Sequence, residues 1–208
     1  MRRFEDRRWT SRRQAPVWRH RAALELVRQV PVLDVGGGDG LFLRMLAERG
    51  LSPAEMTDLS PVAVERARSD GLTAHLVDLD EGLPFADGAF GTVCALDVLE
   101  HLTDPAAALS EMARVGREVV VVVPNFSYWR DRIRVAFGRV PFQLRPGRGH
   151  VTWFNATVLR DLLSTTQLRV DEIVHAGSTR LSGPGALLAS RLPNAFAHSF
   201  AVRAARPG

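Results

Sequence analysis

The feature that most limits the fold of this chain is a glycine-rich segment directly after a short apolar run. Residues 30–40 read Val-Pro-Val-Leu-Asp-Val-Gly-Gly-Gly-Asp-Gly, and a helix-like segment follows over 41–49. Glycine tolerates positive φ and has no Cβ, so a ligand can approach the bare backbone of such a turn. A helix N-terminus adds unpaired N–H groups and a partial positive charge. The segment therefore predicts a strand, a tight turn and a helix start that together bind a small ligand.

Apolar strand-like runs alternate with helix-like segments through most of the chain. We expect strands near 30–35, 54–58, 73–77, 91–97 and 118–123, and helices near 22–29, 40–50, 61–70 and 105–115. A helix near 156–165 and strands near 168–175 and 196–204 follow, with a surface connection over 177–193. This alternation predicts an α/β fold with a parallel, doubly wound sheet. The unbroken valine run at 119–123 predicts a central strand that is covered on both faces.

Length and charge predict one globular domain with two basic segments. The 208 residues suffice for a single core, which we place at 30–208 behind a basic N-terminal arm and helix at 1–29. Residues 1–21 hold eight arginines and two acids, and residues 130–148 hold six arginines and one acid. The arm either is a solvated lead segment or folds over the ligand site. All 27 basic residues are arginine, which excludes Schiff-base chemistry and a lysine phosphate loop.

The glycine spacing distinguishes between two kinds of nucleotide ligand. A dinucleotide fingerprint, G-x-G-x-x-G, would need glycine at position 41, which is leucine here. Asp34 would repel a pyrophosphate but suits a ligand with an ammonium group. The pattern D-x-G-x-G-x-G resembles motif I of class I S-adenosylmethionine (SAM) dependent methyltransferases. An NAD-dependent oxidoreductase stays as an alternative, against which Leu41 and Asp34 argue.

Acidic residues recur at the expected strand ends. Asp58 ends the second strand, 18 residues beyond Gly40, and one carboxylate there can accept both ribose hydroxyls of an adenosine. Asp78 follows the third strand, where the resemblance implies a contact with the adenine amino group, and Asp80 competes for that role. The resemblance implies a Rossmann-like seven-stranded sheet, mostly parallel, with an antiparallel C-terminal hairpin. It also implies cofactor-binding residues Asp34, Gly36, Gly38, Gly40, Asp58, Leu59, Asp78, Leu79 and Leu96.

A second resemblance covers about 78–142. The stretch 115–130, Val-Gly-Arg-Glu-Val-Val-Val-Val-Val-Pro-Asn-Phe-Ser-Tyr-Trp-Arg, and Gly138-Arg-Val-Pro141 are similar to MetW proteins of methionine biosynthesis. After Pro141 the chain departs from that family, and 150–154 resembles small-molecule methyltransferases. We describe 126–154 as a basic and aromatic cap insert, with a helix that either lies over the site or packs on the sheet.

These patterns predict a SAM-dependent methyltransferase that transfers a methyl group to a small-molecule acceptor, with anionic acceptors included, rather than to nucleic acid. The alternative is a non-catalytic, MetW-like SAM-binding partner of a methionine-pathway acyltransferase. His101 and His150 are candidates for a general base, or are structural histidines, and no histidine or cysteine spacing indicates a metal site. Cys94 cannot form an internal disulfide, which fits the cytoplasm, and no apolar run is long enough for a membrane span. The methyl acceptor and the oligomeric state do not follow from the sequence.

Overall fold

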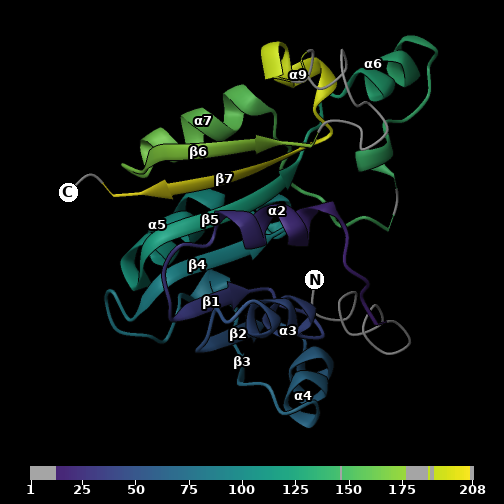
Figure 1. Cartoon of the computed structure of the whole chain (residues 1–208). Helices are drawn as coiled ribbons and strands as arrows, with labels where there is room; N and C mark the ends of the chain where they lie inside the picture. The colour runs from purple at the N-terminus through teal and green to yellow at the C-terminus, as the bar shows by residue number, and fades with distance from the viewer. Residues whose placement is uncertain (1–12, 146, 177–186, 188–189, 207–208) are drawn as a thin grey trace.

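A seven-stranded sheet organises the chain (Figure 1). The structure is a computed structural model that describes residues 13–145, 147–176, 187 and 190–206. The strand order is β3-β2-β1-β4-β5-β7-β6. Neighbouring strands are parallel from β3 to β5, and β7 runs antiparallel to both β5 and β6. The predicted fold, mostly parallel with an antiparallel C-terminal pair, is confirmed. The strands are β1 (Val32–Val35), β2 (Ala54–Asp58), β3 (Ala74–Leu76), β4 (Phe90–Leu96), β5 (Gly116–Pro124), β6 (Arg169–His175) and β7 (Ser199–Ala205).

Helices cover both faces of the sheet. One core cluster joins the sheet to α5 and α7, and clusters on the opposite face join it to α2, α3 and α4. The valine run of β5 is fully buried between these layers, as predicted for a central strand. The helices are α2 (Trp18–Leu26), α3 (Leu41–Glu48), α4 (Pro61–Ser69), α5 (Pro105–Val115), α6 (Trp129–Ala136), α7 (Ala156–Thr165) and α9 (Pro193–Phe196). The described residues also form the 3₁₀ turns η1 (Leu79–Glu81), η2 (Leu99–His101) and η3 (Phe142–Leu144).

Local sequence signals set several helix starts. The side chains of Ser60, Asp104 and Asn155 each accept backbone N–H groups at the starts of α4, α5 and α7. The first helix differs from its prediction, because it begins at Trp18 and ends at Leu26 rather than spanning 22–29. The Val17 N–H donates to His20 Nδ1 at 3.2 Å, which fixes this earlier start. Part of the basic arm is thus ordered helix, while residues 1–12 lie outside the described residues.

The topology places a ligand crevice between β1 and β4. The chain runs from β1 outward to β3 and then returns to β4, on the other side of β1. Open α/β sheets bind ligands at such a reversal of strand order, beyond the carboxyl ends of the strands. Most of the predicted surface connection at 177–193 lies outside the described residues. No described helix is long and apolar enough to cross a membrane.

Candidate functional site

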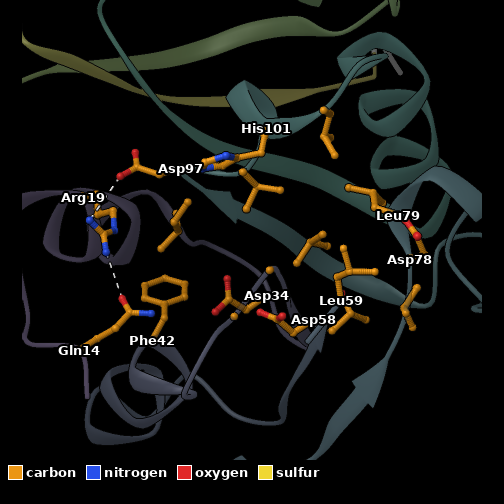
Figure 2. A pocket seen from close by; sticks show the side chains of 18 of the residues that line it. Gln14, Arg19, Asp34, Phe42, Asp58, Leu59, Asp78, Leu79, Asp97 and His101 are labelled. Atoms are coloured by element: carbon orange, nitrogen blue, oxygen red, sulfur yellow. Dashed lines mark hydrogen bonds and ion pairs between the residues drawn. The ribbon is translucent and has the colours of Figure 1, made fainter. Parts of the chain in front are cut away.

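A cavity of about 390 Å³ opens at the carboxyl ends of β1, β2 and β4. Its wall comes from the turn after β1, the ends of β2 and β4, the segment 77–80 after β3, and η2. The N-terminal segment and α3 complete it. Figure 2 shows Asp34 and Asp58 side by side at its base, with Asp78 on one side and Arg19 and Asp97 on the other. The structure thus brings three predicted acids, from three neighbouring strand ends, to one hollow.

Most of the predicted cofactor-binding residues line this cavity, and some lie just behind it. The predicted residues on its wall are Asp34, Gly36, Asp58, Leu59, Asp78, Leu79 and Leu96, together with Asp80 and His101. Gly38 and Gly40 are not part of the wall. They shape the turn instead: the Gly38 N–H donates to Asp58 Oδ2 at 2.9 Å, and Gly40 is the N-cap of α3.

The glycine turn leaves no room for side chains. Gly36 has φ +71°, and a Cβ there would lie 2.6 Å from Val98 Cγ2. At Gly37, a Cβ would lie 2.9 Å from Met56 Cβ and 3.0 Å from Asp34 Oδ2. The N–H groups of both glycines donate to the Thr57 carbonyl, at 2.8 and 3.0 Å. Hydrogen bonds to β2 and close packing therefore fix the backbone that lines the cavity.

Asp58 both supports the turn and faces the cavity. Its carboxylate oxygens accept the N–H groups of Gly38 at 2.9 Å and Ser60 at 2.8 Å. The side chain is almost fully buried, yet it is part of the cavity wall. Each oxygen of a carboxylate can accept more than one hydrogen bond, so a carboxylate on the cavity wall can support the turn and also bind a ligand hydroxyl. The geometry is compatible with the predicted ribose contact.

Asp34 is the most perturbed acid at the site. It is 2% exposed. Burial and the nearby charge of Asp58 raise its pKa to about 8, although Arg19 opposes this rise. A buried carboxyl group of this kind is neutral at pH 7 unless a cation comes to lie beside it. The arrangement suits a ligand that carries its own positive charge.

Asp78 and Asp80 remain equivalent candidates for an adenine contact. Both line the cavity; Asp78 is partly exposed and Asp80 is exposed. Asp78 Oδ1 accepts the Asp80 N–H at 3.1 Å, where it caps η1. The apolar side chains of Leu59, Leu79 and Val77 lie on the same part of the wall. A flat aromatic ring could lie between these apolar groups with an edge toward either carboxylate.

The N-terminal segment supplies wall residues that sequence reasoning did not assign. Arg19 Nη1 pairs with Asp97 Oδ2 at 3.3 Å on one side of the cavity, as Figure 2 shows, and Arg19 Nη2 donates to Gln14 Oε1 at 3.0 Å. The Gln14 N–H donates to Asp39 Oδ2 at 2.9 Å. Burial lowers the pKa of His20 to about 4, with a smaller effect from Arg19. The basic arm was expected either to be solvated or to fold over the ligand site. Residues 13–20 fit the second expectation, because they close one side of the cavity. The high arginine content of this segment was the sequence feature that indicated such a role.

The cap insert at 126–154 contributes little to the cavity. None of its described residues is part of the wall, and Figure 1 shows α6 well away from β1. Phe137 is 77% exposed, and Ile133 and Val135 are also exposed. The expectation that this helix lies over the site is therefore wrong for the cavity described here. The end of the insert does reach the rim, because His101 Nδ1 donates to the Gly149 carbonyl at 3.0 Å.

The two histidine candidates lie together. His101 is part of the cavity wall, and the His150 ring meets it edge to face with centroids 4.9 Å apart. One ligating atom from each of Glu100, His101 and His150 lies within 4.8 Å of the others. Glu100 was given no chemical role from the sequence. Cys94, by contrast, is buried in β4, and burial raises the pKa of its thiol, as expected of an inert core residue.

Comparisons with known proteins agree with this fold. A bifunctional methionine biosynthesis protein MetXA/MetW of Rhodopirellula baltica is 32% identical over 161 residues, which are 69% of this chain and 26% of that protein. The chain thus spans about a quarter of that relative's length. A Haloferax volcanii methyltransferase, solved with the Trm112 methyltransferase activator, has a TM-score of 0.68 at 20% identity, covering 92% of this chain and 90% of the other.

A second solved structure has the same fold and contains ligands. Geranyl diphosphate C-methyltransferase from Streptomyces coelicolor, in complex with Mg²⁺, geranyl diphosphate and S-adenosyl-L-homocysteine, gives a TM-score of 0.62 at 15% identity. The match covers 90% of this chain and 76% of that one. The family model described as methionine biosynthesis protein MetW matches residues 19–179, most of the chain. The chain therefore belongs to the MetW family and has the class I methyltransferase fold.

Proposed function

We propose that the chain binds SAM in the cavity and transfers its methyl group to a small-molecule acceptor. The observation that carries the proposal is the meeting of Asp34, Asp58 and Asp78 on one cavity wall, each from a different strand end. Their order along the chain is the order in which the methyltransferase resemblance assigns acids to the methionine, ribose and adenine parts of SAM. The cavity of about 390 Å³ lies within the usual size range of small-molecule sites.

Each group of the wall suits one part of SAM. The Asp34 carboxyl would meet the ammonium of the methionine part, and Asp58 would accept the ribose hydroxyls. Asp78 or Asp80 would accept the adenine amino group, between Leu59 and Leu79. A carboxylate-rich wall favours a cationic adenosyl ligand over a pyrophosphate, so an NAD-dependent reaction is disfavoured by the same residues.

SAM supplies an activated methyl group on a positive sulfur, so the protein needs mainly to position the acceptor and exclude water. Holding two reactants in line can supply roughly 7–11 kcal/mol of the barrier reduction. The N-terminal segment closes one side of the cavity through the Arg19–Asp97 pair, which limits the entry of water there. The side near His101 is where an acceptor would approach, and His101 or His150 would take its proton where the acceptor must lose one.

Calorimetric titration with SAM and with S-adenosylhomocysteine tests the binding step. Asp58→Asn is the matched variant, because it keeps the size of the side chain and alters its capacity to accept hydroxyl hydrogen bonds. Folded protein that binds neither ligand would refute the proposal. Methyl transfer is then followed as S-adenosylhomocysteine formation with panels of small carboxylate, hydroxyl and amine acceptors.

A second candidate function is a SAM-binding partner, without turnover, of a methionine-pathway acyltransferase. Its support is the Rhodopirellula baltica relative, whose printed name joins MetXA and MetW in one chain. The exposed apolar side chains of the α6 segment, including Phe137 and Val140, offer a surface for such a partner. This candidate predicts ligand binding without methyl transfer, and co-purification of the chain with the acyltransferase. Turnover by the isolated chain would contradict it.

A further inference from the structure

Beside the cavity lies a cluster of side chains that cofactor binding does not require. Glu100 and His101 are consecutive residues of η2, and His150 comes from the loop before α7. Within the described residues, these three form the group of metal-ligating side chains whose donor atoms come within 4.8 Å of one another. Two imidazoles and one carboxylate are a donor set that divalent transition metals take in proteins.

The backbone around the cluster is held by hydrogen bonds between η2 and the loop 149–152. The Glu100 carbonyl accepts the N–H groups of Val151 at 2.8 Å and Thr152 at 3.1 Å. Thr152 Oγ1 donates to the Leu102 carbonyl at 2.8 Å. The two segments, about 50 residues apart in sequence, are thus tied together on both sides of the histidines. A cluster held in this way is preorganised for a bound ion.

The hydrogen bond of His101 fixes which ring nitrogen can bind a metal. A carbonyl oxygen can only accept, so Nδ1 must carry the proton that it donates to the Gly149 carbonyl at 3.0 Å. In the neutral imidazole, Nε2 then keeps its lone pair. Histidine ligands of metals commonly donate their other N–H to a backbone carbonyl in this manner, which sets the tautomer and the ring orientation.

Burial and position distinguish this cluster from surface acidic groups. Glu100 is 1% exposed, whereas His101 and His150 are partly exposed and His101 reaches the cavity wall. Figure 2 shows the His101 side chain on the cavity side of its helical turn. A cation there would have a buried carboxylate on one side and the open cavity on the other. Three protein ligands leave a coordination position open, as in catalytic rather than structural metal sites.

We propose that Glu100, His101 and His150 bind a divalent transition-metal ion at the cavity wall, with an open coordination position toward the cavity. The ion would take an oxygen atom of the acceptor, such as a hydroxyl or carboxylate group. With the ion bound, the two histidines would serve as ligands rather than as bases, and the ion itself would favour loss of a proton from an acceptor hydroxyl. This role for the acceptor rests on the proposed methyl transfer, whereas binding of the ion does not. No residue spacing along the chain indicates such a site, because the third ligand lies 49 residues after His101 and is brought near only by the fold.

The test uses the full chain, stripped of metal by a chelator and then titrated with CoCl₂ and, separately, ZnCl₂. We expect one equivalent of Co²⁺ to bind, with visible d–d absorption typical of nitrogen and oxygen ligands. His150→Gln should bind Co²⁺ at least about tenfold more weakly, since one of three ligands is lost. Glu100→Gln should do the same, with circular dichroism as a check on folding.

His75→Gln is the matched control. His75 Nε2 lies 2.7 Å from Glu55 Oε2 on the far strands β2 and β3, so this variant removes a histidine paired with a glutamate outside the cluster. It should bind Co²⁺ like the unaltered protein. The proposal is overturned if the unaltered, folded chain takes up no stoichiometric Co²⁺, or if His150→Gln binds it equally well.

Titration of the same samples with S-adenosylhomocysteine separates the two proposals. His150 is not part of the cavity wall, so His150→Gln should bind this ligand with unchanged affinity. Metal binding without S-adenosylhomocysteine binding would refute the proposed function and leave the metal site supported. The reverse result would refute the metal site alone.

Discussion

Binding of SAM or S-adenosylhomocysteine should release close to one proton from Asp34 below neutral pH. In the free protein this carboxyl group has a pKa of about 8, because it is buried and lies near the charge of Asp58. The ligand's ammonium would stabilise the ionised form and lower that pKa. Binding must then expel the proton that Asp34 carries in the free state.

The size of the effect follows from the two ionisations. At pH 6.5 a group with a pKa of about 8 is about 97% protonated, and a ligand amino group with a pKa of about 7.8 is about 95% charged. The net release is therefore about 0.9 proton per ligand bound. By the same arithmetic, the apparent affinity should rise about eightfold from pH 6 to pH 7.

The assay is calorimetric titration with S-adenosylhomocysteine at pH 6.5 in two buffers of different ionisation enthalpy. The dependence of the observed heat on the buffer gives the number of protons released. Asp34→Asn is the matched variant, since it replaces a neutral carboxyl group by a neutral amide, and its binding should not depend on the buffer. Methylthioadenosine, which lacks the ammonium, should release no proton from the unaltered chain. Equal heats in both buffers for S-adenosylhomocysteine would refute the ammonium assignment.

Three further predictions concern the turn and the N-terminal segment. Asp58→Ala should weaken S-adenosylhomocysteine binding by about 1–3 kcal/mol, because the ribose hydroxyls and the Gly38 N–H lose their acceptor; calorimetry that finds unchanged affinity would contradict the ribose assignment. Gly37→Ala should lower the unfolding midpoint in urea, because its Cβ would lie 2.9 Å from Met56 Cβ, and an unchanged midpoint would show that the turn adapts. The pKa of His20 is lowered to about 4 in the folded state, so the unfolded chain binds more protons below the unfolded value of 6.5. The contribution of His20 to the free energy of unfolding should therefore fall from pH 6.5 toward pH 5. In the same urea series, the stability of the unaltered protein relative to His20→Gln should decline over this range.

The sequence predicted the sheet well because its signals are local. The valine run of β5 and the capping residues of α4 and α7 each act within a few residues, and α7 spans 156–165 as expected. The acids at strand ends were also predictable, since parallel strands present their carboxyl ends at one edge. For the same reason Asp34 and Asp58 could be assigned to one site before the fold was known.

Contacts between distant segments were not predictable from these patterns. Arg19 reaches Asp97 only because α2 packs on β5 and β7, which no local signal in residues 13–26 indicates. The meeting of His150 with His101 depends on the path of the loop that precedes α7. The aromatic pattern of the cap insert correctly indicated a helix at α6, but hydrophobic periodicity alone does not say which surface that helix covers.

Energetically unfavourable features of the described residues, namely backbone strain and a buried acid, lie at the cavity. This favours a ligand-binding site over a hollow that binds nothing. Two residues other than glycine have positive φ among those described, Asp97 and Gln167, both at 58°. Gln167 directly follows the C-cap of α7, where a left-handed residue commonly ends a helix. Asp97 ends no helix and instead lies on the cavity wall, where backbone strain is typical of functional sites.

The burial of the Asp34 carboxyl group is a second energetically unfavourable feature of the cavity. Its folded pKa of about 8 lies above the ordinary value of 3.8, so its contribution to the stability of the free protein is present below about pH 4 and is lost as the pH rises through 8. A core with no ligand to bind would be more stable with an apolar residue at this position. A cationic ligand would reverse the penalty, because it stabilises the ionised carboxylate in place. The same buried acid that weakens the free protein near neutral pH therefore favours a bound ammonium, which is the group that SAM would bring.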